Sequence, residues 1–233
     1  MFKKGNLPTT IFILVLIVLI ALAVFSSIKK DDAKPATTAT SEEVAFDMKK
    51  QPIYGSEDAP ISMTIFYDYQ CPHCKQWEEE TFPVLKEGIF DKKVANIRFV
   101  NYSFMNGSSD YLAMAGELVY DKNPSQFVAF HEELFKNQTN LSTTKTIDLT
   151  AKYSGISKEE VTNLLTNAKY KGNIDSDKKE GTRLGVSGTP SLFIDGKRVE
   201  NAYDLKEIQD TVNKKLKTLQ QAEKTTKTEE DTK

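Results

Sequence analysis

The chain has 233 residues, with 31 Lys and Arg against 33 Asp and Glu and a formal net charge of −2. This length suits one domain that buries its own core. Because both signs of charge are mixed along most of the chain, the sequence gives no sign of a nucleic-acid-binding surface, and we expect no nucleic-acid partner.

The first 30 residues differ in kind from the rest. An almost unbroken apolar run extends from Ile11 to Phe25, and with its flanks it reaches about 22 residues, enough to cross a bilayer. Two interpretations remain open for 1–30: an uncleaved membrane anchor, or a signal peptide cleaved after Ala23. Lysines flank both ends of the run, so charge alone leaves its orientation open.

Polar segments bound the remaining domain. Residues 31–50 include an aperiodic stretch rich in small polar residues, which predicts a flexible spacer. Residues 221–233 have a similar polar character and are predicted to be a disordered tail. The folded domain is therefore expected at 51–220.

Within that domain, strand-like and helix-like patterns alternate. In chain order they predict a strand, a helix, a second strand, a helical block, a β-hairpin and a last helix, at 61–69, 75–82, 94–102, about 107–184, 191–202 and about 204–219. Two β-rich halves are thus separated by a helical insertion. This order predicts an α/β protein with a helical subdomain inserted between the halves of its sheet.

The only two cysteines, Cys71 and Cys74, stand in the sequence CPHC, directly after a predicted strand and at the start of a helix. Unpaired backbone N–H groups and the helix dipole stabilise a thiolate at that point, so we expect a lowered pKa for Cys71. Cys74 lies one turn further, on the same face, and should be more covered. This asymmetry predicts a redox pair with an exposed attacking sulfur and a buried resolving sulfur.

The two residues between the cysteines favour the same chemistry. Pro72 suits the first helical turn, where its missing N–H is no loss. His73 can supply a positive imidazolium or an N–H near the Cys71 sulfur. Both favour the thiolate, and therefore a more oxidising disulfide.

Two other interpretations of the pair stay open. A structural disulfide would close a very short loop and would constrain the unfolded chain little. A zinc site needs two more ligands, and His131 is the only histidine besides His73. We expect His131 to be an ordinary helix residue, and Trp77 to pack in the core against the helix that carries the cysteines.

A second motif strengthens the redox interpretation. In GVSGTPSLFIDG, the Thr189-Pro190 pair comes immediately before a predicted strand. An X-Pro bond there is a plausible cis peptide, and it would leave the Thr189 backbone as a short edge that an extended peptide can pair with. The alternative is a turn with a trans bond.

Together these motifs resemble the DsbA-like thiol–disulfide oxidoreductases on the thioredoxin fold, and most closely their membrane-anchored Gram-positive, BdbD-like type. The resemblance covers about 51–219 and rests on DYQCPHC combined with GVSGTP. It implies a nucleophile at Cys71, a resolving thiol at Cys74 and a cis-proline at Pro190 facing them. It also implies re-oxidation by a membrane quinone-linked thiol oxidase.

The sequence departs from this family in one respect. Members often carry a buried acid six residues before the first cysteine, and here that position is Ile65. Asp68 either serves partly in its place or is a turn residue. Some relatives bind structural calcium, but the acidic cluster at 173–180 lacks the pattern of an EF-hand loop. We expect it to be solvated helix surface, and we expect no metal site.

The sequence therefore predicts a monomeric enzyme that donates disulfides to reduced exported proteins or peptides, with no metal or organic cofactor beyond its own Cys71–Cys74 disulfide. Such chemistry is useful outside the cytoplasm, so the domain should lie there, behind a single-pass anchor or secreted after cleavage. Two alternatives remain: a disulfide reductase or isomerase, and a non-catalytic peptide-binding module on the same fold.

Overall fold

The structure is a computed structural model, and it describes residues 47–230. The apolar segment predicted at 1–30 and most of the predicted spacer lie outside the described residues. Within 47–230, every helix is too short or too polar to cross a bilayer.

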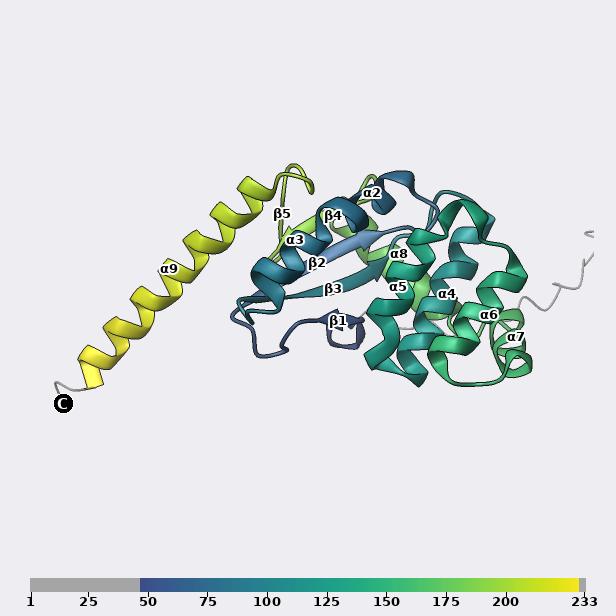
Figure 1. The fold of residues 1–233 in the computed structure, drawn as a ribbon. Coiled ribbons are helices and arrows are strands. Elements are labelled where there is room, and N and C mark those ends of the chain that lie inside the picture. Colours follow the sequence, from purple (N-terminus) through teal and green to yellow (C-terminus); the bar gives the residue numbers. More distant parts are fainter. Residues whose placement is uncertain (1–46, 231–233) are drawn as a thin grey trace, which may run out of the picture. The chain divides into compact units, whose positions relative to one another are not determined.

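A five-stranded mixed sheet forms the centre of the fold (Figure 1). Its strands lie in the order β1-β3-β2-β4-β5, and only β2 and β3 are parallel. The strands are β1 (Ile53–Tyr54), β2 (Ile61–Tyr67), β3 (Ala95–Asn101), β4 (Ser191–Ile194) and β5 (Lys197–Arg198). Strand β1 was not predicted, since a two-residue strand is too short to show an alternating pattern.

Helices fill the long connection between β3 and β4. The α-helices before and after it are α2 (Pro72–Glu80), α3 (Phe82–Leu85) and α9 (Leu205–Glu230), and those within it are α4 (Gly107–Lys122), α5 (Phe127–Lys136), α6 (Thr143–Ser154), α7 (Lys158–Thr166) and α8 (Lys171–Arg183). Short helical turns occur at η1 (Met48–Lys50), η2 (Lys86–Phe90), η3 (Pro124–Gln126) and η4 (Gln138–Asn140). The predicted fold class, an α/β thioredoxin-like fold with an inserted helical subdomain, is confirmed.

Strand β2 divides the core into two clusters because its side chains alternate between the faces of the sheet. Ile65 and Tyr67 belong to the larger cluster, which also holds both cysteines and side chains from α2, α4 and α5. Phe66 points to the other face and packs with Val100, Val186 and Phe193. The cysteine helix therefore rests on the more extensive core.

Two predicted boundaries need correction. The helix predicted at 75–82 ends at Glu80, and the short helix α3, which carries Pro83, follows it. The predicted disordered tail is wrong for 221–230, because α9 continues to Glu230. This stretch contains helix-forming Ala, Glu and Lys and no Gly or Pro that would end a helix.

Candidate active site

The two cysteines lie where β2 gives way to α2. After Tyr67 the chain turns, and the Cys71 N–H donates to the Asp68 carbonyl at 3.0 Å. Cys71 is the N-cap of α2, with an extended backbone (φ −79°, ψ 118°), and Pro72 occupies the first position of the helix. The Cys71 sulfur therefore sits beside N–H groups that have no partner within the helix.

The surroundings of Cys71 favour its thiolate. A hydrogen bond from the Cys74 thiol has the largest effect, burial opposes it, and Thr189 and the backbone N–H groups of Cys74 and His73 add to it. Together they lower the pKa of Cys71 to about 5. Burial, followed by the neighbouring Cys71 sulfur, raises the pKa of Cys74 well above its ordinary value. At neutral pH the reduced pair thus carries one thiolate, on Cys71.

One sequence expectation about the pair is wrong. Cys71 was expected to be exposed, but only 4% of it is accessible, against 2% for Cys74. The cover comes from a distant part of the chain: the Cys71 sulfur lies 3.3 Å from the carbonyl oxygen of Thr189, which is 118 residues away. The two sulfurs thus differ little in accessible surface, and their pKa values differ because hydrogen bonds outweigh burial at Cys71 while burial has the largest effect at Cys74.

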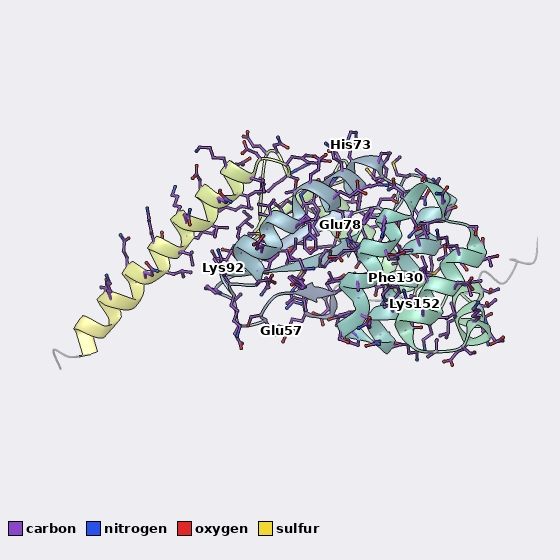
Figure 2. All side chains as sticks on the ribbon, viewed as in Figure 1. Glu57, His73, Glu78, Lys92, Phe130 and Lys152 are labelled. Carbon is purple, nitrogen blue, oxygen red and sulfur yellow. The ribbon has the colours of Figure 1, made fainter. Side chains whose placement is uncertain are left out.

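The other predicted site residues fall around the pair. The Thr189-Pro190 bond is cis, and β4 begins at the next residue. Pro72 and His73 are both exposed on the first turn of α2. His73 lies at the surface (Figure 2), and it is its backbone N–H that contributes to the lowered pKa of Cys71.

Asp68 holds the neighbouring loop in place. One carboxylate oxygen accepts from the Gln70 N–H at 2.8 Å, and the other accepts from the N–H groups of Phe104 and Met105 at 2.8 and 3.0 Å. Both oxygens are therefore occupied by backbone donors. Of the two roles open to Asp68, this geometry favours the turn residue over the proton acceptor.

Distant side chains fix the position of α2, and the sequence did not reveal them. Gln138 lies in the helical insertion, and its Nε2 donates to the carbonyl oxygens of Tyr69 and Cys71 at 3.0 and 2.9 Å. On the other side, the Tyr203 hydroxyl donates to the His73 carbonyl at 2.6 Å. Trp77 is buried, as expected, and its indole N–H donates to the Ala202 carbonyl.

His131 is not the ordinary helix residue that the sequence suggested. It is 1% exposed, its Nε2 lies 3.4 Å from a carboxylate oxygen of Glu78, and its Nδ1 lies 2.9 Å from the Tyr69 hydroxyl. Glu78 is also buried. The available signal was spacing: Glu78 follows Cys74 by four residues, on the helix face that also carries Trp77.

Two further acids, Glu117 and Asp177, are buried, which corrects the expectation that the cluster at 173–180 is solvated. Asp177, predicted to be solvated, is 1% exposed, and it accepts from the Gln51 side chain and the Asn101 N–H. Glu117 accepts from the side chains of Asn101 and Asn173. Burial raises the pKa of both carboxyl groups. Asp177 lies on α8, which packs against β3. The acidic residues around it in the sequence do not reveal this packing.

These acids bear on the calcium that the resemblance implies for some relatives. Among residues 47–230, no group of three His, Cys, Asp or Glu side chains could hold a metal ion. Calcium, however, also accepts amide oxygens, and the buried Gln51 Oε1 lacks a hydrogen-bond donor among the described residues. Two carboxylates and this amide oxygen fit a calcium ion, and Gln51, Glu117 and Asp177 would hold it.

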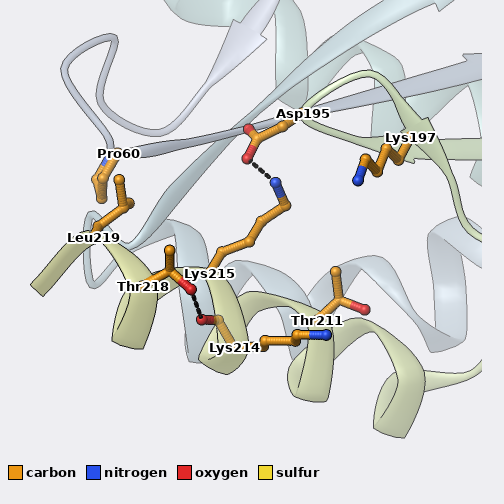
Figure 3. A pocket seen from close by; sticks show the side chains of 8 residues that line it. All are labelled: Pro60, Asp195, Lys197, Thr211, Lys214, Lys215, Thr218 and Leu219. Atoms are coloured by element: carbon orange, nitrogen blue, oxygen red, sulfur yellow. Dashed lines mark hydrogen bonds and ion pairs between the residues drawn. The ribbon is translucent and has the colours of Figure 1, made fainter. Parts of the chain in front are cut away.

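A separate pocket of about 470 Å³ lies between α9 and the turn that joins β4 to β5 (Figure 3). It is lined by Pro60, Asp195, Lys197, Thr211, Lys214, Lys215, Thr218 and Leu219, and an ion pair between Lys215 and Asp195 at 2.6 Å spans it. None of these residues belongs to the cysteine site, so the pocket adds nothing to its chemistry.

Comparisons with known proteins agree with this geometry. A sequence profile of the family described as Thioredoxin matches residues 47–214. The chain is 30% identical over 175 residues to disulfide bond formation protein D of Bacillus subtilis (strain 168), covering 73% of this chain and 79% of that protein.

Solved structures of similar proteins share this fold. The oxidised BdbD structure from Bacillus subtilis has a TM-score of 0.69 and 30% identity, over 73% of this chain and 95% of that one. DsbA from Chlamydia trachomatis has a TM-score of 0.66 over 76% of this chain and 95% of that one, and at 20% identity it supports the fold alone.

Proposed function

Because the chain belongs to the DsbA-like thiol–disulfide oxidoreductases of the thioredoxin family, we propose that it donates disulfides to reduced exported proteins outside the cytoplasm. The enzyme class is that of its relatives, thiol–disulfide exchange in oxidative folding. The direction of exchange, the substrates and the location are the proposal.

The proposed reaction takes two thiol–disulfide exchanges. A substrate thiolate attacks the Cys71 sulfur of the Cys71–Cys74 disulfide, a mixed disulfide forms, and Cys74 leaves. A second substrate thiolate attacks the substrate sulfur of that mixed disulfide, and Cys71 leaves as a thiolate. The substrate loses two electrons and becomes a disulfide, and the cysteine pair gains them and becomes reduced.

One observation carries the proposed direction: the Cys71 sulfur sits at the N-terminus of α2 and receives a hydrogen bond from the Cys74 thiol. These interactions stabilise the Cys71 thiolate, which exists only in the reduced pair. A stabilised reduced form makes the disulfide a stronger oxidant. The geometry thus favours a donor over the alternative reductase.

The remaining parts of the proposal concern partners and location. Residues 1–30 anchor the chain as a single span with the N-terminus in the cytoplasm, or the domain is secreted if they are cleaved. A membrane quinone-linked thiol oxidase re-oxidises the pair, and the enzyme works as a monomer without a metal or organic cofactor in its redox chemistry. The apolar run in the sequence supports the anchor, and the usefulness of disulfide donation outside the cytoplasm supports the location.

The decisive test is the reduction potential of the chain lacking residues 1–30, equilibrated in glutathione buffers. We expect a value near roughly −120 mV, typical of a strong oxidant, and a value near roughly −270 mV would assign the protein to the reductases. Replacing Cys71 with serine separates the third possibility, because a peptide-binding module keeps its role in cells without that sulfur and a disulfide donor loses it.

A further inference from the structure

Glu78 presents a problem that the exchange reaction alone does not explain. Only 5% of the residue is accessible, and neither carboxylate oxygen has a hydrogen-bond partner among residues 47–230. Burial of a carboxylate without donors is unfavourable. Its neighbours in the sequence, Glu79 and Glu80, are both exposed, so the burial is specific to this one position of the acidic run.

The position of Glu78 relates it to the resolving cysteine. Cys74, Trp77 and Glu78 form the buried face of α2. Residues four apart on a helix are neighbours, with Cβ atoms about 5–6 Å apart. Glu78 therefore lies one turn beneath Cys74, the sulfur that must gain a proton when the pair is reduced and lose it when the pair is oxidised.

His131 completes a buried pair with Glu78. It comes from α5, which packs against α2, and its Nε2 is 3.4 Å from Glu78 Oε2. Its other ring nitrogen meets the Tyr69 hydroxyl at 2.9 Å, and that hydroxyl lies 3.4 Å from the Tyr67 hydroxyl. The imidazole is thus held by one polar partner and presents its second nitrogen to the carboxylate.

The strand position six residues before Cys71 is apolar. Ile65 is 1% exposed and belongs to the core cluster that contains Cys71 and Cys74. Asp68 is occupied by backbone donors. Among the buried residues of α2, which are Cys74, Trp77 and Glu78, Glu78 is the acid.

We propose that Glu78 and His131 form a buried proton relay for Cys74. The inference rests on the disulfide exchange proposed above. When a substrate thiolate attacks Cys71, the Cys71–Cys74 bond breaks and the pair gives one proton to the leaving Cys74 sulfur. The Glu78–His131 pair is left with one proton fewer.

The same proton returns in re-oxidation. With Cys71 in a mixed disulfide to the oxidising partner, the Cys74 thiol gives its proton to the Glu78–His131 pair. The Cys74 thiolate then attacks the Cys71 sulfur, the Cys71–Cys74 bond forms, and the partner leaves as a thiolate. The relay ends each cycle as it began, so a buried pair with no path to solvent can perform it.

The other titratable groups around the relay are Tyr67 and Tyr69 from β2 and the turn after it, and Glu117 from α4. Burial raises the pKa of both tyrosines above their ordinary value, so they stay neutral in the range where the relay works. Glu117 acts on Tyr67 and Tyr69 through its charge, and its pKa is raised by burial.

The test isolates the step that needs the Cys74 proton to leave. The reduced full chain is converted to a mixed disulfide of Cys71 with glutathione, and the rate at which Cys74 releases glutathione is followed by stopped flow from about pH 5.5 to about pH 8.5. A positioned acid–base group contributes about 100-fold or more to a proton transfer. For Glu78→Gln we expect a loss of at least about tenfold near pH 6 that shrinks as hydroxide takes over at higher pH.

Matched variants separate the relay from a structural role. Glu79→Gln changes the exposed neighbour on the same helix and should behave as wild type. His131→Asn should give the same pH-dependent loss as Glu78→Gln. Adding Ile65→Glu to Glu78→Gln places an acid on β2, in the core cluster that contains both cysteines. This double variant should recover most of the rate of glutathione release.

Two results would overturn the relay: an unchanged rate in Glu78→Gln and His131→Asn, or a loss of the same size at every pH. The pH profile of Cys71 alkylation, which the relay does not control, must stay as in wild type and shows that α2 is intact. Failure of the relay is distinguishable from failure of the proposed function, because the wild-type reduction potential tests the latter independently.

Discussion

The hydrogen bond between the two sulfurs gives the most direct quantitative prediction. It has the largest effect among the causes that lower the pKa of Cys71 from 9.0 to about 5. A hydrogen bond to a charged group contributes about 1.5–3 kcal/mol, and one pKa unit corresponds to about 1.4 kcal/mol. Replacing Cys74 with alanine should therefore raise the pKa of Cys71 by about 1–2 units.

The assay is the rate of Cys71 alkylation by iodoacetamide as a function of pH, which reports the thiolate fraction. We expect a midpoint of about 5 for wild type and about 6–7 for Cys74→Ala. Cys74→Ser keeps a hydroxyl donor and is the matched control, with a midpoint nearer to wild type. An alanine variant that titrates like wild type would refute the role of the hydrogen bond. A midpoint at the value of a free cysteine would refute the contribution of the helix N-terminus.

Three further outcomes follow from the same contacts. Because the folded-state pKa of Cys71 is depressed, the reduced protein should gain stability over the oxidised protein as pH rises from about 5 to 9.0, measured as the difference between their melting temperatures; a constant difference would contradict the linkage. Because burial raises the pKa of Glu117, the free energy of unfolding of the metal-free domain should fall as pH rises above the ordinary carboxyl pKa. In denaturant titrations, Glu117→Gln should weaken this dependence on pH. Added Ca²⁺ should raise the free energy of unfolding of wild type most at high pH. Gln138→Ala removes two hydrogen bonds to the backbone around Cys71 and should lower the free energy of unfolding by about 1–3 kcal/mol, while Gln126→Ala, at an exposed position, should change it by less than about 0.5 kcal/mol.

Local signals in the sequence were enough to predict the parts of the site that depend on local geometry. Cys71 at the junction of strand and helix, Pro72 in the first turn and Thr189-Pro190 before a strand all follow from the residues beside them. The β-branched and aromatic composition of 61–69 likewise identified β2, although the strand ends two residues earlier, where Asp68 starts the turn.

The parts that escaped prediction depend on which distant surfaces meet. His131 contacts Glu78 only because α5 packs against α2. Gln138 donates to the Cys71 carbonyl from 67 residues away in the chain. Asp177 looked solvated because its sequence neighbours are charged, yet the packing of α8 buries it. Glu78 alone had a usable local signal, since its helical spacing from Cys74 and Trp77 placed it on the covered face.

The cover over the Cys71 sulfur has a consequence for how the protein is made. The cysteines lie in the first third of the chain, whereas Gln138 and Thr189 follow 67 and 118 residues after Cys71. During synthesis from the N-terminus, both thiols are therefore present before Gln138 and Thr189 have been synthesised. Because only two residues separate Cys71 from Cys74, the pair can close its own disulfide before those covering segments have been synthesised.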